Sequence, residues 1–162
     1  DGGGWRDVYK VNNRDEFFAA YDQTRTLCMT LQRGVNFQEY FRCYVVGQEQ
    51  VHVMPYDPRA PFHERYVMNP PAYPKGLLER VERDARTLCR ALGYDLNTVE
   101  FAVEDGVPYA IDFMNPAPDA DLHSVGQANF DWIVTEVAKL AVKQATEPAP
   151  PATYRWDAFL KG

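Results

Sequence analysis

The segment TVEFAVEDGVPYAIDFMNPAPD, Thr98–Asp119, contains two runs of β-branched and aromatic residues separated by turn-forming residues. The first run is 98–103, the second is 107–114, and Glu104-Asp105-Gly106 lies between them. Runs of this length around a glycine-containing turn predict two antiparallel strands joined as a β-hairpin. Each predicted strand carries one acidic side chain within an otherwise apolar run.

These two acids are Glu100 and Asp112, and the length of the turn decides whether they meet. Alternate residues of a strand point to opposite faces, so a two-residue loop would place the acids on opposite faces of the sheet. A three-residue loop, Glu104–Gly106, makes them diagonal neighbours on one face. Loops of this length favour a left-handed last residue, which Gly106 supplies. We therefore expect the three-residue loop and converging acids.

Two carboxylates that converge among apolar neighbours repel each other and resist the loss of water. A divalent cation relieves both effects, and Mg²⁺ takes oxygen ligands and often bridges to substrate phosphates. Asn115, which comes after the second strand, adds a neutral amide oxygen. The pattern indicates a magnesium–nucleotide site. The residues alone leave one alternative open, in which Glu100 faces solvent and Asp112 caps the next turn.

The elements on either side of this hairpin predict an α+β fold, an antiparallel β-sheet with flanking helices. The clearest helix is 77–92, because its apolar residues recur at three-and-four spacing and Gly93 comes next as a stop. The other expected elements are strands at 8–11 and 27–31, a helix capped by Asn12 or Asn13, a strand pair at 36–47 and 51–54, a proline-rich loop at 55–74, and a last helix at about 130–145.

Composition excludes several classes of function. The chain has 17 Lys and Arg against 23 Asp and Glu, a net charge of −6, which argues against a nucleic-acid partner. No run of apolar residues is long enough to cross a bilayer, so we expect no membrane partner. The three cysteines are widely spaced, which favours reduced thiols and a cytoplasmic location.

Several segments, taken in order, resemble the ATP-grasp superfamily, in the branch of carboxylate–amine ligases. GGGWRDVYKV resembles the glycine-rich loop and strand over the phosphates, and FQEYF resembles the hinge that meets adenine. RCYVVG resembles the strand after the hinge. The helix ending ALGY and the hairpin VEFAVEDGVPYAIDFMNPAP resemble the metal-binding end. The resemblance covers roughly residues 1–146 and implies ATP and Mg²⁺ as cofactors and an acyl phosphate intermediate.

The resemblance also implies roles for individual residues. Arg42 opens the strand after the hinge, where a contact with phosphate and a structural ion pair are equally open. The other implied site residues are Glu100, Asp112 and Asn115 for the metal, Gly2, Gly3 and Gly4 over the phosphates, and Gln38, Glu39 and Tyr40 at the adenine hinge.

Some family features differ or are missing. The two nucleotide-binding lysines and the pre-grasp domain precede the loop with which this chain begins. We therefore expect the C-terminal lobe of an ATP-grasp domain with part of the smaller lobe, inactive alone, whose partners are the N-terminal part of the same protein and a carboxylate substrate. The expected divisions are a phosphate-loop sub-lobe at 1–35, a metal- and nucleotide-binding lobe at 36–146 and a proline-rich tail at 147–162.

The hinge runs directly into the next strand, without the usual acid for the ribose. The first metal acid is Glu instead of Asp, and the second is Asp instead of Glu. The interval from Asp112 to Asn115 is three where the family has two, so a bulge at Phe113-Met114 is needed for Asn115 to share the face of Asp112.

The sequence leaves two alternatives of other classes open. One is a non-catalytic interaction module with a degenerate nucleotide site, with the aromatic tail docking a partner. The other is a transition-metal site in the loop formed by Asp119, Asp121 and His123, although capping by Asp121 is the simpler role.

Overall fold

The computed structural model describes residues 7–147 of the chain. It divides into two compact units, Asp1–Gly34 and Val35–Gly162. None of the helices within residues 7–147 is long and apolar enough to span a bilayer.

Residues 7–34 of the first unit contain one helix, α1 (Arg14–Thr24). Asn13 is its N-cap, since its side chain accepts a hydrogen bond from the Glu16 backbone N–H at 2.9 Å. This confirms the predicted capping. The predicted strands at 8–11 and 27–31 are wrong, because both segments are irregular. Both segments carry exposed aliphatic side chains, among them Leu31, which is 74% exposed. β-propensity alone does not form a strand where no ladder partner lies beside it.

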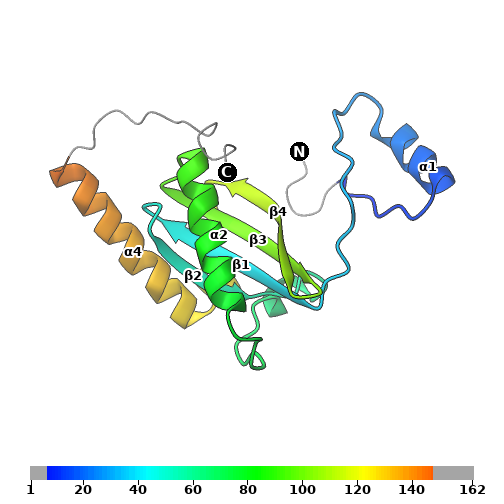
Figure 1. The fold of residues 1–162 in the computed structure, drawn as a ribbon. Coiled ribbons are helices and arrows are strands. Elements are labelled where there is room, and N and C mark those ends of the chain that lie inside the picture. The colour runs from blue at the N-terminus through cyan, green and yellow to red at the C-terminus, as the bar shows by residue number, and fades with distance from the viewer. Residues whose placement is uncertain (1–6, 148–162) are drawn as a thin grey trace. The chain divides into compact units, whose positions relative to one another are not determined.

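The second unit is built on a four-stranded antiparallel sheet in the order β2-β1-β3-β4 (Figure 1). The strands are β1 (Glu39–Val46), β2 (Gln50–Pro55), β3 (Leu96–Glu104) and β4 (Val107–Asn115). The helices and turns are η2 (Phe62–Glu64), α2 (Leu77–Leu92), α3 (Leu122–Val125) and α4 (Gln127–Thr146). The predicted α+β class and antiparallel sheet are confirmed.

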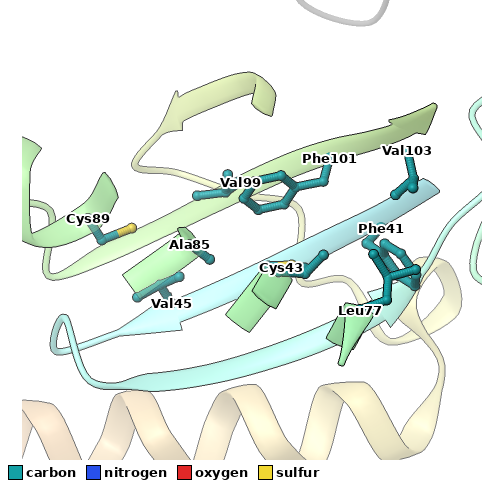
Figure 2. Packing of buried hydrophobic residues seen from close by; sticks show 10 residues of the cluster. Phe41, Cys43, Val45, Leu77, Ala85, Cys89, Val99, Phe101 and Val103 are labelled. Atoms are coloured by element: carbon teal, nitrogen blue, oxygen red, sulfur yellow. The ribbon is translucent and has the colours of Figure 1, made fainter. Parts of the chain in front are cut away.

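Helix α2 covers one face of the sheet, as Figure 1 shows. Its buried residues Leu77, Val81, Ala85 and Cys89 lie on one side of the helix, as the three-and-four spacing predicts. Figure 2 shows Leu77, Ala85 and Cys89 of the helix beside alternate residues of the central strands. The strand residues in this cluster are Phe41, Cys43, Val45, Val99, Phe101 and Val103.

The other face of the sheet is more aromatic and more polar. Buried tyrosines of β1 and of the loop after β2 pack there with Ile133 of α4 and Val125 of α3. The residues between α2 and the sheet are therefore the odd-numbered positions of β1 and β3, and the even-numbered positions belong to this second face. Glu100 and Arg42 are even-numbered, so the second face carries the candidate site.

The turn between β3 and β4 has two residues, not three. Glu104 pairs with Val107, and Asp105 and Gly106 form the turn with φ of 53° and 74°. The three-residue loop predicted from Gly106 is wrong. Positive φ at both central residues is the geometry of a type I′ turn, which Asp-Gly sequences favour. Without a further irregularity, this turn would place the two acids on opposite faces.

Two irregularities in β4 correct the register. Phe101 pairs with Ala110, but Glu100 pairs with Asp112, so one extra residue is accommodated at Ile111. A second shift lies between Glu100 and Thr98, which pairs with Asn115. The second shift adds one residue at Phe113-Met114 and confirms the bulge expected there. Each bulge inserts one residue into β4 and so reverses the faces to which the later residues of the strand point.

Replacing Gly106 with alanine tests the turn. The φ of 74° at Gly106 is left-handed, although an added Cβ would meet open space. We expect Gly106→Ala to lower the free energy of unfolding by about 1–2 kcal/mol, from backbone strain alone. The measurement is denaturant unfolding of both proteins.

Gly34→Ala is the control, since a Cβ at Gly34 also meets open space and its φ is outside the left-handed region. That variant should be neutral or more stable by up to about 1 kcal/mol. Equal effects of the two changes would contradict the turn described here.

Candidate metal and nucleotide site

The candidate site is a row of directly paired residues across three strands. Arg42 of β1 pairs with Glu100 of β3, and Glu100 pairs with Asp112 of β4. Directly paired residues of an antiparallel sheet point to the same face, with Cβ atoms about 4.5–5.5 Å apart. The two carboxylates are therefore direct neighbours, which is closer than the diagonal arrangement predicted from the sequence.

Glu100 is held from two sides. The Tyr40 hydroxyl donates a short hydrogen bond to its Oε2 atom, and Arg42 Nε lies 3.6 Å from its Oε1 atom. The side chains of Arg42 and Glu100 are 10% and 16% exposed, so this ion pair lies largely away from water. Asp112, in contrast, is exposed.

The surroundings of Glu100 raise the pKa of its carboxyl group. Burial is the main cause, and the neighbouring carboxylate of Asp112 raises it further. The hydrogen bond from Tyr40 and the charge of Arg42 act in the opposite direction but do not cancel the rise. Glu100 and Asp112 together also raise the pKa of the Tyr40 hydroxyl, after burial. A cation close to Glu100 would oppose this rise, because it would stabilise the charged carboxylate.

Arg42 is anchored among tyrosines. Its Nη1 atom donates to the Tyr66 hydroxyl at 3.0 Å, and its guanidinium lies 5.7 Å from the centre of the Tyr56 ring. Its Nε atom and the Tyr44 hydroxyl are buried without a hydrogen-bond partner among the described residues. Burial raises the pKa of Tyr66 to about 12, although Arg42 opposes the rise. The tyrosines therefore act as neutral groups around one buried cation.

Asn115 joins the acids by way of the second bulge. It pairs with Thr98, which lies two residues before Glu100 on β3, so its position belongs to the face of Glu100 and Asp112. Its side chain is partly exposed. Two carboxylates and one amide oxygen on one face of a hairpin are ligands that suit Mg²⁺ and leave room for water and phosphate oxygens. The three residues predicted for the metal thus share one face of the sheet.

The predicted hinge residues lie at the start of β1 and make hydrogen bonds that hold neighbouring strands. Gln38 binds the β3–β4 turn, because its Oε1 atom accepts from the Asp105 backbone N–H at 2.9 Å. Tyr40 directs its hydroxyl to Glu100. Together with Glu39 they line a cavity of about 160 Å³, whose other walls include Tyr56 and Tyr73. Tyr40 therefore lines the cavity and also contacts the carboxylate of Glu100.

The loop acids predicted as a further metal site do not add to this row. Gly2, Gly3 and Gly4 lie outside the described residues. Within residues 7–147, no group of three His, Cys, Asp or Glu side chains is placed to hold a metal, so the loop alternative lacks support. Asp121 instead caps α3, since its side chain accepts from the His123 backbone N–H at 2.9 Å. Asp119 accepts a short hydrogen bond from Ser124.

Two groups of residues near the site were missed by the sequence. Tyr56 and Tyr66 surround Arg42 but come from the loop region after β2, where proline obscures any periodicity. Asn97 holds the second bulge through its side chain. Asn97 could have been noticed as a polar residue at a position that the alternation along β3 predicts to be buried.

Comparisons with known proteins bear on the fold. No protein-family model and no curated sequence matches the chain. A solved structure of D-alanine–D-alanine ligase from Bacillus anthracis complexed with ATP superposes with a TM-score of 0.61 and 18% identity, covering 86% of this chain and 50% of that one. A second structure of the same ligase gives a TM-score of 0.60 and 16% identity, covering 86% and 51%. The chain thus spans about half the length of that ligase and shares the ATP-grasp fold.

Proposed function

We propose, from this ATP-grasp fold, that the chain is the ATP- and Mg²⁺-binding part of a ligase that joins a carboxylate to an amine-type nucleophile. The reaction proposed for the whole protein converts the substrate carboxylate into an acyl phosphate with release of ADP. The amine then attacks the acyl carbon and phosphate leaves. The substrate carboxylate and the N-terminal part of the same protein are the proposed partners, and the chain alone is proposed to be inactive.

The observation that carries this proposal is the direct pairing of Glu100 with Asp112. A pair of carboxylates on one face, one of them largely buried, is electrostatically unfavourable unless a cation lies nearby. Arg42 meets this need on the side of Glu100 that faces β1, and the charge of Arg65 adds a smaller contribution. Mg²⁺ held by Glu100, Asp112 and Asn115 would serve the other side and neutralise charge on the transferred phosphoryl group.

The proposed nucleotide contacts rest on the same placement. Gln38, Glu39 and Tyr40 line the cavity and would meet the adenine there. Arg42 would act on phosphate only through Glu100, because its guanidinium is buried among Tyr56, Tyr66 and Glu100. Gly2, Gly3 and Gly4 keep their proposed role over the phosphates.

The test is the magnesium enhancement, defined as the ratio of the ATP dissociation constants without and with Mg²⁺, measured on the intact protein. We expect Glu100→Gln to lower this ratio about tenfold or more, because even an outer-shell partner of a metal contributes 10–100-fold to its affinity. ATP binding in the presence of a chelator should persist.

The matched control is Glu79→Gln, which removes the same charge from an exposed position in the first turn of α2. It should leave the enhancement unchanged. An unchanged enhancement in Glu100→Gln as well would contradict the proposed metal site.

The second candidate function is a non-catalytic interaction module. It is favoured by the engagement of both Glu100 oxygens, one by Tyr40 and the other by Arg42. A module of this kind would bind ATP weakly or not at all and would show no magnesium enhancement. The same titration therefore separates the two functions.

A further inference from the structure

Asn97 is a polar residue in the apolar layer beneath α2. It is 0% exposed, and it pairs with Val45 on β1 and lies two residues before Val99 on β3. Both valines belong to the cluster that packs against α2. A buried amide costs free energy unless its hydrogen bonds are made, whereas an aliphatic side chain would fill the same space without that cost. The presence of asparagine at this position therefore needs an explanation other than packing.

The contacts of Asn97 are with the backbone of β4. Its Nδ2 atom donates to the Phe113 carbonyl at 2.8 Å, and its Oδ1 atom accepts from the Asn115 backbone N–H at 2.8 Å. A longer contact of 3.4 Å joins Nδ2 to Cys89 Sγ of α2. One side chain thus clamps both ends of the segment Phe113–Asn115, which contains the second bulge.

This bulge decides where Asn115 points. Asp112 and Asn115 are three residues apart, so in a regular strand they would face opposite sides. The extra residue at Phe113-Met114 brings Asn115 into register with Thr98, on the face of Asp112. A bulge disturbs the ladder and leaves backbone groups needing other partners. Asn97 supplies one donor and one acceptor at that point.

We propose that Asn97 is a positioning residue for the metal site, which holds the β4 bulge so that Asn115 shares a face with Glu100 and Asp112. This inference rests on the proposed function, since it assigns a purpose to the bulge only if the three residues bind one ion. Asn97 itself acts from the opposite face and does not touch the ion.

The variant Asn97→Leu removes both clamping hydrogen bonds and keeps an apolar volume beneath α2. We expect its magnesium enhancement to fall about tenfold, as for other outer-shell partners of metals, while ATP binding in chelator stays unchanged. Val103→Ala is the control, because it removes buried volume from the same face of β3 at a position that pairs with Pro108, away from the second bulge. It should lower stability and keep the enhancement.

Deletion of Met114 in the Asn97→Leu background provides a rescue. The deletion makes the interval from Asp112 to Asn115 two residues, so the two side chains share a face in a regular ladder without a clamp. We expect the enhancement to return toward the wild-type value. If Asn97→Leu does not fold, Asn97→Asp, which keeps an acceptor for the Asn115 N–H, takes its place and should retain part of the enhancement.

The outcomes separate the two proposals. A normal enhancement in Asn97→Leu together with its loss in Glu100→Gln overturns the role of Asn97 and leaves the metal site standing. A normal enhancement in both variants overturns the metal site. An equal loss in Val103→Ala, or a folded deletion variant without recovery, shows that Asn97 acts through stability alone and overturns the inference.

Discussion

Replacing Arg42 with leucine is expected to lower the free energy of unfolding by about 3–5 kcal/mol, because a buried acid would lose its cation. Glu100 is 16% exposed and would keep the hydrogen bond from Tyr40 and the smaller electrostatic contribution of Arg65. The Tyr66 hydroxyl would also lose its donor. Equilibrium unfolding in denaturant at neutral pH measures the loss.

The double variant Arg42→Leu, Glu100→Leu separates the buried charge from packing. Removing both partners of a buried ion pair is often neutral or stabilising, so the double variant should recover most of the stability lost in Arg42→Leu. A loss below about 1 kcal/mol in the single variant would match an exposed ion pair and would contradict the burial of this one.

Phe101→Ala is expected to cost about 3–5 kcal/mol, the range for truncating a buried aromatic side chain. Phe101 is 2% exposed and pairs with Phe41 on β1, which is 0% exposed. Both lie in the cluster beneath α2, where Tyr73 packs edge-on against Phe41 with centroids 4.9 Å apart. The cavity left by the truncation would border α2 and the centre of the sheet.

Thermal and denaturant unfolding of Phe101→Ala should agree on this loss. Val142→Ala is a suitable control, because Val142 on α4 is 64% exposed. Its change in the free energy of unfolding should stay within about 0.5 kcal/mol. A loss of similar size in both variants would indicate that the layer beneath α2 is not the main core.

The parts of the fold with a strong local pattern were predictable. Helix α2 spans Leu77–Leu92 as expected, since its apolar spacing and its glycine stop point to the same bounds. Helix α4 begins at Gln127, a few residues before the expected start, and the short α3 was missed. The strands expected at 8–11 and 27–31 did not form, because strand formation depends on a partner that local sequence does not reveal.

The site was predicted for a partly mistaken reason. The acids were expected to converge through a three-residue turn, whereas the Asp-Gly turn has two residues and the bulge at Ile111 supplies the missing step. The second bulge was expected from the ATP-grasp resemblance, because the interval from Asp112 to Asn115 is three where the family has two. The tyrosines around Arg42 could not be predicted, since they meet only through the tertiary fold.

Strand β4 lies at the end of the sheet order, so its outer edge has no ladder partner among the described strands. A straight outer strand invites pairing with another chain and promotes aggregation. The two bulges and Pro108 interrupt the even spacing of donors and acceptors that such pairing requires. The distortion that gathers the acidic groups therefore also protects the protein against self-association through this edge.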